Sequence, residues 1–413
     1  MRKFVALAFI QLGFLAACGG GGYVVTTTPP PPSQNIATPG PPNVETLTVD
    51  AGPAGAVNTA FVSVKVCVPG GTTSCKTIDH IEVDTGSVGL RILSSVLTTA
   101  PAITLPPQTD GTNPLAECLR FADGDAWGPL AVADIQLPVS GESATNVNVQ
   151  IIGDPAYTAL PSDCMTNPEN TVANFGANGI LGVGPFAQDC GSACVGAIPS
   201  TGAVYYSCPS PSSCASTPLS TLLQQLQNPV SLFATDNNGV IVELPAVGSA
   251  GAVTVTGSLV FGIGTQSNNA LGSATVLQED MFSGLITATY KGTAYSDGFI
   301  DSGSNGNFFT DSSIKTCTTP PSQNPWYCPS AEVSETATLQ GTNATMLTAN
   351  FSVANADGLF NTGYAAFSDL GGTNPDPTGM GFDLGLPYFY GRNVYTAVEN
   401  ANAGGYVGPY FAY

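Results

Sequence analysis

One four-residue pattern occurs twice in this chain, as Asp84-Thr85-Gly86-Ser87 and as Asp301-Ser302-Gly303-Ser304. Each copy follows a short apolar run that predicts a buried strand, over residues 81–83 and 298–300. Each is followed, at a similar interval, by a Leu-Gly pair at residues 181–182 and 384–385. Two copies of one pattern in matching contexts predict a duplicated domain that brings Asp84 and Asp301 face to face.

The composition favours strands over helices. The 413 residues are enough for two lobes with cores of their own. Charged residues make up only 9%, whereas Gly (48) and Pro (33) are abundant. Because long exposed helices usually need Lys and Glu, we predict an all-β fold, mainly strands and turns with few short helices. Strands are predicted over 61–66, 131–139, 146–152 and 257–262, and the clearest helix candidate is 217–227.

Charge and histidine content limit the possible partners. The net charge is −20, with nine Lys and Arg residues, so nucleic acid and anionic membrane surfaces are poor partners. His80 is the one histidine, which excludes a multi-His metal site and favours a structural role for this residue. The acidic balance also makes a dinucleotide cofactor a poorer candidate, although charge alone does not exclude one.

The N-terminus predicts a lipid anchor. Residues 1–3 are positively charged at two positions, residues 4–15 are apolar, and Leu15-Ala16-Ala17-Cys18 resembles a bacterial lipobox. We predict a lipoprotein signal peptide over 1–18, lipidation of Cys18, and a Pro-, Gly- and Thr-rich tether over 19–45. An ordinary secretory signal with an incidental cysteine is the alternative. The expected location is the bacterial cell envelope, at the outer membrane by resemblance to other lipoproteins, with membrane contact only through Cys18.

The cysteines predict disulfides. Ten cysteines follow Cys18, and an even count in an exported chain suggests five bridges. Zinc binding is the competing interpretation, but no Cys-x-x-Cys pair and no partner histidine support it. The local candidates are Cys67 with Cys75 and Cys317 with Cys328, while the other pairings stay open.

Two lobes are expected after the tether, an N-terminal lobe over 46–240 and a C-terminal lobe over 241–413. Residues 185–228 form a Cys-, Ser- and Pro-rich insert with four cysteines, which we interpret as a disulfide-stapled loop. The insert either binds a partner or elaborates the surface.

The order of motifs resembles the bilobal, pepsin-like aspartic proteases. The similarity lies in the two Asp motifs, in residues 178–184, in residues 257–262, and in residues 384–389 followed by 395–399. It therefore spans about residues 46 to 413. The chain also looks like a group of uncharacterised bacterial lipoproteins that carry a domain of unknown function.

The resemblance implies a bilobal fold with two β-barrel-like lobes and a cleft between them. Asp84 and Asp301 would be the catalytic pair, sharing a proton and activating a water against a peptide carbonyl. Pepsin is a familiar case of two carboxyls that share a proton in this way. Six neighbours would support the pair: Thr85, Gly86, Ser87, Ser302, Gly303 and Ser304. Of these, Ser87 and Ser304 would each hydrogen-bond the outer oxygen of their carboxylate. A peptide or protein would occupy the cleft of a monomer, and the reaction would require no metal and no organic cofactor.

Three positions depart from the family pattern. Arg91 stands where the family has a Trp, and Phe121 falls where the flap Tyr would be, so both partners of one hydrogen bond are replaced. The flap is expected over 119–128, with Asp123-Gly124 at its tip and Trp127 either covering the cleft or packing within the hairpin. Asp383 replaces an apolar residue beneath the second loop and would need either a proton or a partner, for which Arg91 is a candidate.

Three functions follow from these observations. The first is an envelope-anchored aspartic endopeptidase. The second is a pepsin-fold lipoprotein with weak or no proteolysis that acts as a binding or structural module, which the three departures favour. The third is an unrelated β-rich surface domain in which Asp84 and Asp301 are separate turn residues.

Overall fold

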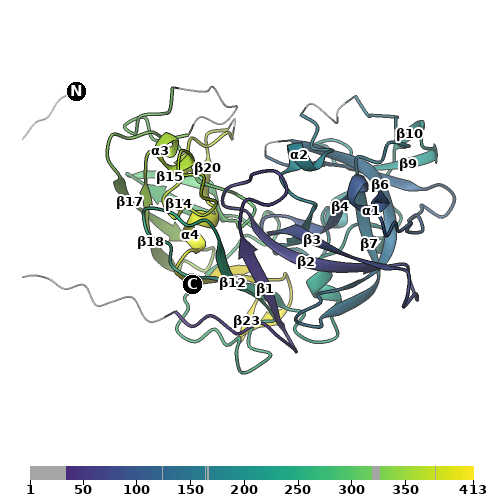
Figure 1. Cartoon of the computed structure of the whole chain (residues 1–413), viewed down its shortest axis with the longest axis horizontal. Coiled ribbons are helices and arrows are strands. Elements are labelled where there is room, and N and C mark those ends of the chain that lie inside the picture. Colours follow the sequence, from purple (N-terminus) through teal and green to yellow (C-terminus); the bar gives the residue numbers. More distant parts are fainter. Residues whose placement is uncertain (1–33, 123, 163, 165–166, 319–325, 377) are drawn as a thin grey trace, which may run out of the picture. The chain divides into compact units, whose positions relative to one another are not determined.

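The structure is a computed structural model that describes residues 34–413, except 123, 163, 165–166, 319–325 and 377 (Figure 1). The predicted signal peptide, its Cys18 and residues 19–33 of the predicted tether lie outside the described residues, as does Asp123. The strands of the described part are β1 (Val44–Val49), β2 (Ala60–Cys67), β3 (Cys75–Asp84), β4 (Val88–Leu93), β5 (Leu115–Arg120), β6 (Asp125–Gln136), β7 (Ser143–Ile152), β8 (Gly179–Val183), β9 (Tyr205–Ser210), β10 (Ser213–Ser216), β11 (Gly239–Leu244), β12 (Val255–Phe261), β13 (Val276–Gln278), β14 (Ile286–Tyr290), β15 (Thr293–Ile300), β16 (Asn307–Phe308), β17 (Val333–Gln340), β18 (Met346–Val353), β19 (Gly371–Gly372), β20 (Gly381–Leu384), β21 (Arg392–Ala397), β22 (Asn402–Ala403), β23 (Tyr406–Val407) and β24 (Tyr410–Ala412).

Helices are few and short, as the composition predicted. They are α1 (Ser94–Thr98), α2 (Val172–Phe175), α3 (Ala356–Phe360), α4 (Leu386–Phe389) and the single 3₁₀ turns η1 (Gly191–Cys194), η2 (Leu222–Gln224) and η3 (Pro229–Leu232). In this part of the chain, no helix has the length and the apolar character needed to cross a membrane.

The first half of the sheet closes on itself. β6, β7, β4, β8, β3 and β2 follow one another in hydrogen-bonded order, and β2 pairs back to β6. The closure buries alternating apolar residues such as Val62, Val64 and Val66 of β2 inside the ring. This barrel-like half lies on the β3 and β7 side of the molecule in Figure 1, opposite β17 and β18.

The second half repeats the central pairing of the first. β3 runs parallel to β8, which is antiparallel to β4, which is parallel to β7. In the same way, β15 runs parallel to β20, which is antiparallel to β16, which is parallel to β19. The predicted duplication is therefore present in the backbone, although the two halves share little sequence outside the Asp motifs.

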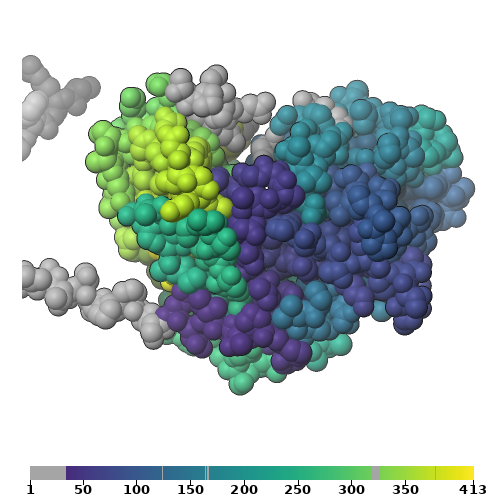
Figure 2. Space-filling model, viewed as in Figure 1, coloured from purple at the N-terminus to yellow at the C-terminus, as the bar shows by residue number. Residues whose placement is uncertain are grey.

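A continuous sheet joins the two halves. β1 pairs with both β2 and β12, and β11 pairs with both β12 and β21. The expected boundary between residues 240 and 241 lies within β11, so the chain crosses from one half to the other inside a paired strand. In the space-filling view, the purple N-terminal strands fill the surface between the blue and the yellow-green residues (Figure 2).

The predicted tether over 19–45 extends too far toward the C-terminus. Gln34 donates to the carbonyl oxygens of Leu244 and Arg392, at 2.8 and 2.7 Å, and the Ala37 amide donates to Glu243 at 2.6 Å. β1 then begins at Val44. These polar contacts and the pairing of β1 attach residues 34–45 to the folded unit, despite their Pro-rich composition.

The predicted helix over 217–227 is wrong. Only η2 forms there, one turn with a capping box between Thr221 and Gln224. Leu222 and Leu223 are exposed, while Leu226 is buried. The segment therefore has no continuous apolar stripe to hold a longer helix against the core.

All ten described cysteines form disulfides, as predicted. The two local candidates are correct, Cys67–Cys75 and Cys317–Cys328. The others are Cys118–Cys164, Cys190–Cys194 and Cys208–Cys214. Two of these bridges lie within residues 185–228, so the insert is a disulfide-stapled segment. Its strands β9 and β10 extend the β5–β6 hairpin into a wider sheet.

Candidate active site

Each Asp of the repeated motif lies at the end of a strand that has a parallel neighbour. Asp84 ends β3 and Asp301 follows β15, while Gly182 and Gly385 lie at the ends of β8 and β20 beside them. A Cβ atom on Gly385 would lie 2.2 Å from the Gly306 carbonyl oxygen, and one on Gly182 would lie 2.6 Å from the Val88 amide. The Leu-Gly pairs are therefore required because the Asp loops pass directly over these glycines.

Reciprocal hydroxyl contacts lock the two loops together. The Ser302 hydroxyl accepts from the Thr85 amide at 3.1 Å and donates to the Val83 carbonyl at 2.7 Å. The Thr85 hydroxyl accepts from the Ser302 amide at 2.9 Å. Both hydroxyl residues are buried, at 1% exposure or less. The loops are thus joined by hydrogen bonds that pair each hydroxyl with the opposite backbone.

The lock brings the two carboxyl groups into contact. The amide of Gly86 donates to Asp84 at 2.7 Å, and that of Gly303 donates to Asp301 at 2.8 Å. A Cβ on Gly86 would lie 2.7 Å from Asp301, and one on Gly303 would lie 2.6 Å from Asp84, so only glycine fits at either position. Burial and the neighbouring Asp84 carboxylate raise the pKa of Asp301 well above its usual range. The third hypothesis, separate turn residues, is therefore wrong.

The serines at the end of each motif differ. The Ser304 hydroxyl donates to the outer oxygen of Asp301 at 3.0 Å. In contrast, the buried hydroxyl of Ser87 has no hydrogen-bond partner among the described residues. The expectation that both serines bond their carboxylates is therefore correct for Ser304 and wrong for Ser87.

A cleft of about 930 Å³ opens over the two Asp residues. Its walls come from both halves of the chain and from turns at residues 283–285 and 374–376. Acidic side chains line it at Glu82, Asp84, Glu169, Asp189, Asp297, Asp301, Asp376 and Asp383, against Arg91 and Arg120 as the lining cations of the described part. The cleft is large enough for several residues of an extended peptide.

The β5–β6 hairpin lies where the flap was predicted, and its contacts distinguish the three flap candidates that the structure describes. Phe121 lines the cleft and packs edge-on against Phe175, with ring centroids 6.0 Å apart. Gly124 is buried, and a Cβ there would lie 2.5 Å from Glu169. Trp127 is 2% exposed, stacks edge-on with Tyr206 and does not line the cleft. A cleft-covering role for Trp127 is therefore wrong, because its indole packs within the hairpin.

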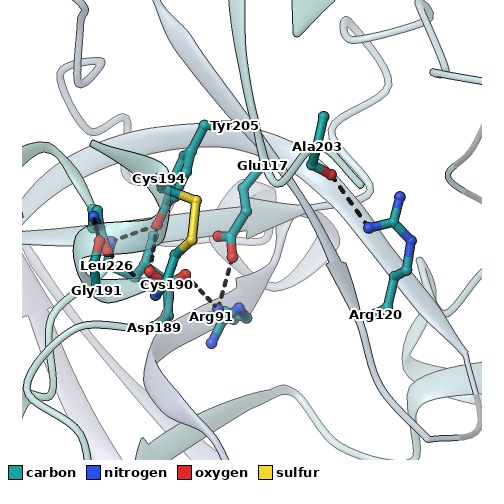
Figure 3. Close-up of a disulfide and its surroundings, with 11 residues drawn as sticks. Arg91, Glu117, Arg120, Asp189, Cys190, Gly191, Cys194, Ala203, Tyr205 and Leu226 are labelled. Carbon is teal, nitrogen blue, oxygen red and sulfur yellow. Dashed lines mark hydrogen bonds and ion pairs between the residues drawn. A yellow bond between two sulfur atoms is a disulfide. The ribbon is translucent and has the colours of Figure 1, made fainter. Parts of the chain in front are cut away.

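Arg91 is fully buried and holds an ion-pair cluster (Figure 3). Its guanidinium donates to Glu117 at 2.8 Å, to Asp189 at 3.3 Å, to Gln150 at 3.1 Å and to the Val88 carbonyl at 2.6 Å. Burial alone would lower the pKa of Arg91, but the Glu117 and Asp189 carboxylates raise it. This cation stands in the place where the pepsin-like family has an aromatic residue.

The cluster joins three parts of the chain that are far apart in the sequence. Glu117 belongs to β5 of the flap hairpin, while Asp189 lies in the insert beside the Cys190–Cys194 disulfide (Figure 3). The Tyr205 hydroxyl donates to Asp189 at 2.5 Å. Burial and the Glu117 carboxylate raise the pKa of Asp189. Sequence reasoning missed these partners, because nothing near Glu117 or Asp189 in the chain signals a buried cation.

Asp383 is not paired with Arg91, contrary to one expectation. Arg91 is bound to Glu117 and Asp189, whereas Asp383 is buried beside the Asp pair. Burial raises the pKa of Asp383 well above its usual range. The expectation that this carboxyl needs a proton is thus supported by its surroundings, and the suggested cation partner is wrong.

Other titratable clusters do not form a second centre in the part of the chain that the structure describes. His80 lies 3.4 Å from Asp50 and 3.5 Å from Asp79, outside the cleft. The one group of potential metal ligands is Cys317, Cys328 and Asp357, but the two sulfurs are bonded to each other. That group offers a metal a single free carboxylate.

Taken with the paired strand ends, the facing Asp loops define a bilobal, pepsin-like acid protease fold. The aspartic proteinase from Irpex lacteus has a similar crystal structure, with a TM-score of 0.50 and 14% identity over 89% of this chain and 96% of that one. The chain belongs to the family described as "Protein of unknown function (DUF3443)", whose model matches residues 39–413. No curated protein matches the sequence.

Proposed function

We propose that this protein is an envelope-anchored bacterial aspartic endopeptidase in which Asp84 and Asp301 activate a water molecule. The observation that carries the proposal is the contact between the two carboxyl groups, held by the Thr85 and Ser302 lock. Like charges in contact cannot both ionise easily, so the pair keeps one proton across the acidic range. That state provides one base and one acid within reach of the same water.

The chemistry follows from the arrangement of these groups. The ionised carboxylate takes a proton from water, the water oxygen attacks the peptide carbonyl, and the protonated carboxyl donates to the carbonyl oxygen. Collapse of the tetrahedral intermediate expels the amine as it receives a proton from the pair. The substrate is an extended peptide or unfolded protein in the cleft, and the reaction needs no metal.

The test is proteolysis by the purified full-length protein between pH 3 and pH 7. We expect cleavage of an unfolded protein, inhibition by pepstatin, and a fall of at least about 10³-fold in activity for Asp84→Asn or Asp301→Asn, because each removes an acid–base partner. Asp154→Asn changes a carboxylate in a turn that does not line the cleft, and we expect it to keep wild-type activity.

Wild-type turnover in the Asp84→Asn variant would contradict the proposal. An equal loss of activity in Asp84→Asn, Asp301→Asn and Asp154→Asn would also contradict it, because that pattern indicates a loss of folding rather than of chemistry.

A binding module without proteolysis is the second candidate, and a specific observation favours it. Phe121 lines the cleft at the flap but has no hydroxyl to donate to a substrate or to the core. If this candidate is correct, peptides bind the cleft with equal affinity in wild-type protein and in Asp84→Asn, and no cleavage products appear in mass spectra after long incubation.

Anchoring by Cys18 is part of the same proposal. The full-length protein expressed in a bacterium is expected to incorporate labelled palmitate and to sediment with outer-membrane fragments. Cys18→Ala should abolish both. Labelling that persists in Cys18→Ala would show that the lipobox interpretation is wrong.

A further inference from the structure

The position of Asp383 has a direct counterpart in the first half of the molecule. β20 carries Asp383-Leu384-Gly385 beside the second Asp loop, and β8 carries Ile180-Leu181-Gly182 beside the first. The registers match, since Asp383 pairs with Phe299 and Ile180 pairs with Glu82, each two residues before a catalytic candidate. An apolar residue therefore satisfies this position in one half, and a carboxyl occupies it in the other.

No cation neutralises Asp383 within the described ranges. The side chain is 4% exposed, and its Oδ1 atom has no hydrogen-bond partner. Among the cations that line the cleft, Arg91 is bound by two carboxylates and Arg120 donates to the Ala203 carbonyl. A carboxyl in such a place is costly unless it holds a proton or affects a neighbouring group.

The neighbours of Asp383 are the catalytic candidates. Asp301 and Ser304 lie on the loop that follows β15, and Asp84 lies on the facing loop. Asp297 of β15 lines the same cleft. The strand on the other side, β16, offers Asn307 and Phe308 and no titratable group. Asp376 lines the same cleft from a turn. The ionisable neighbours of Asp383 are therefore carboxyls, and no cation pairs with it in the part of the chain that the structure describes.

Ser304 connects Asp383 to the pair. Its hydroxyl donates to Asp301 at 3.0 Å and lies within hydrogen-bonding reach of Asp383. A serine hydroxyl carries a single proton, so it can satisfy only one of two ionised carboxylates at a time. When the ionised Asp383 takes that proton, the hydroxyl no longer stabilises an ionised Asp301, and the Asp84 and Asp383 charges then favour a proton on Asp301.

We propose that Asp383 is a positioning residue that, together with Ser304, keeps the proton of the catalytic pair on Asp301. In this arrangement Asp84 is the base and Asp301 is the acid. The assignment of roles rests on the proposed endopeptidase function, while the placement of the proton does not.

The direction of the effect follows from the charges. Burial, then the Asp84 carboxylate, then the Asp383 carboxylate raise the pKa of Asp301. Above the pH at which Asp383 ionises, its replacement by a neutral residue removes one of the negative charges that hold the proton on Asp301. The pair then gives up that proton at a lower pH, and the basic limb of activity moves toward acid.

The test follows the carboxyl carbons of the full chain labelled with ¹³C-aspartate, titrated by NMR. The signals of the pair are identified by their loss in Asp84→Asn and Asp301→Asn. In Asp383→Asn, which keeps the shape and a hydrogen bond to Ser304, we expect the upper titration step of the pair to move down by about one pH unit. Asp383→Ile, which gives the second loop the residue of the first, should show a shift at least as large.

Asp369→Asn is the matched control. Asp369 is also a buried carboxyl of the C-terminal half, 2% exposed and without partners for its oxygens, but it does not line the cleft. We expect it to leave the titration of the pair unchanged. An unchanged titration in Asp383→Asn would overturn the proposal. A shift in Asp383→Ile but not in Asp383→Asn would overturn it as well, because the effect would then come from the lost hydrogen bond and not from the lost charge.

The same measurement separates this inference from the proposed function, because it needs no turnover. A shifted titration in a protein that cleaves nothing would support the proton placement and contradict the endopeptidase. If the protein cleaves peptides, the basic limb of its kcat/KM profile should move by the same amount in Asp383→Asn. A basic limb unchanged in that variant would overturn the inference and leave the endopeptidase in place.

Discussion

The first and second Asp loops have the same strand pairing, but side chains of opposite charge lie beside them. Seven residues after each Asp, the first half has Arg91 and the second has Phe308, and these face Ile180 and Asp383 on the adjacent strands. In the first half the charge is a cation on the strand that leaves the loop. In the second it is a carboxyl on the strand beneath the loop. The duplication therefore preserved the strand pairing and let the charges around it diverge.

This difference indicates which contacts support the Asp loop in each half. Around the first loop, Arg91 links β4 to the flap hairpin through Glu117 and to the insert through Asp189. Around the second, Phe308 packs on Trp326, with ring centroids 5.4 Å apart, and no cation joins the loop to other elements in the described residues. Hence the first loop depends on an ion-pair cluster for support, and the second depends on apolar packing.

The largest expected effect comes from breaking the Arg91 cluster. Arg91→Met leaves the Glu117 and Asp189 carboxyls buried without their cation, and we expect a loss of about 3–5 kcal/mol in the free energy of unfolding near pH 7. Urea denaturation of the variant and wild type measures the loss. The loss should shrink as the pH falls, because protonated carboxyls no longer need the cation.

A triple variant tests the cause of that loss. Arg91→Met combined with Glu117→Gln and Asp189→Asn should recover much of the stability, since no buried charge is left unpaired. If Arg91→Met alone costs less than about 1 kcal/mol, or if the triple variant recovers nothing, the support of the first loop does not depend on the ion pairs.

The next effect compares the two serines that end the motifs. Ser304→Ala removes a hydroxyl that donates to Asp301, whereas Ser87→Ala removes one with no described partner. We expect about 0.5–1.5 kcal/mol from the loss of the hydrogen bond to the Asp301 carboxyl at Ser304 and less than about 0.5 kcal/mol at Ser87. Thermal and urea unfolding of both variants provide the comparison. Equal losses would show that the two loops are supported alike.

The smallest effect concerns the pH dependence of stability in each half. Burial raises the pKa of Glu142, in the first half, from 4.5 to about 7 and that of Asp369, in the second, from 3.8 to about 6. A raised pKa in the folded state means that stability is complete below the unfolded value and is lost as the pH rises through the folded one. The melting temperature of the wild type should therefore fall between about pH 4.5 and pH 7.

Two variants show which carboxyl causes each part of the fall in melting temperature. Glu142→Gln should flatten the curve up to about pH 7, and Asp369→Asn should flatten it only up to about pH 6, because each removes one titrating group. Calorimetry at half-unit steps of pH gives the slopes. A wild-type melting temperature that rises over this interval would contradict both assignments.

Much of the candidate site could be predicted because its signal is repeated. The Asp motifs, their apolar strands and the Leu-Gly pairs each occur twice, and the glycines are required by contacts of under 3 Å at Gly86, Gly303, Gly182 and Gly385. Local cysteine spacing also identified Cys67–Cys75 and Cys317–Cys328 correctly. In each case the evidence lies within a few residues, where turn and strand geometry limit the possibilities.

The predictions that were wrong concern contacts between distant parts of the chain. The helix over 217–227, the cleft-covering role of Trp127 and the pairing of Asp383 with Arg91 all depended on what lies across the fold. Leu222 and Leu223 had no core to face, Trp127 found Tyr206 of the insert, and Arg91 found Glu117 and Asp189. No local sequence pattern indicates a contact partner that is distant in the chain.

The amino-acid sequence alone was sufficient for the β-rich class, the duplication and the two facing Asp residues, because repeated motifs and turn glycines restrict the backbone locally. The charges that surround that pair were established by the three-dimensional fold. Burial and distance set the state of a carboxyl, and both depend on long-range strand pairing. The pairing of β20 beside β15 puts Asp383 next to Asp301. The pairing of β5 with β9 of the insert, together with the contacts of Arg91 on β4, surrounds Arg91 with carboxylates.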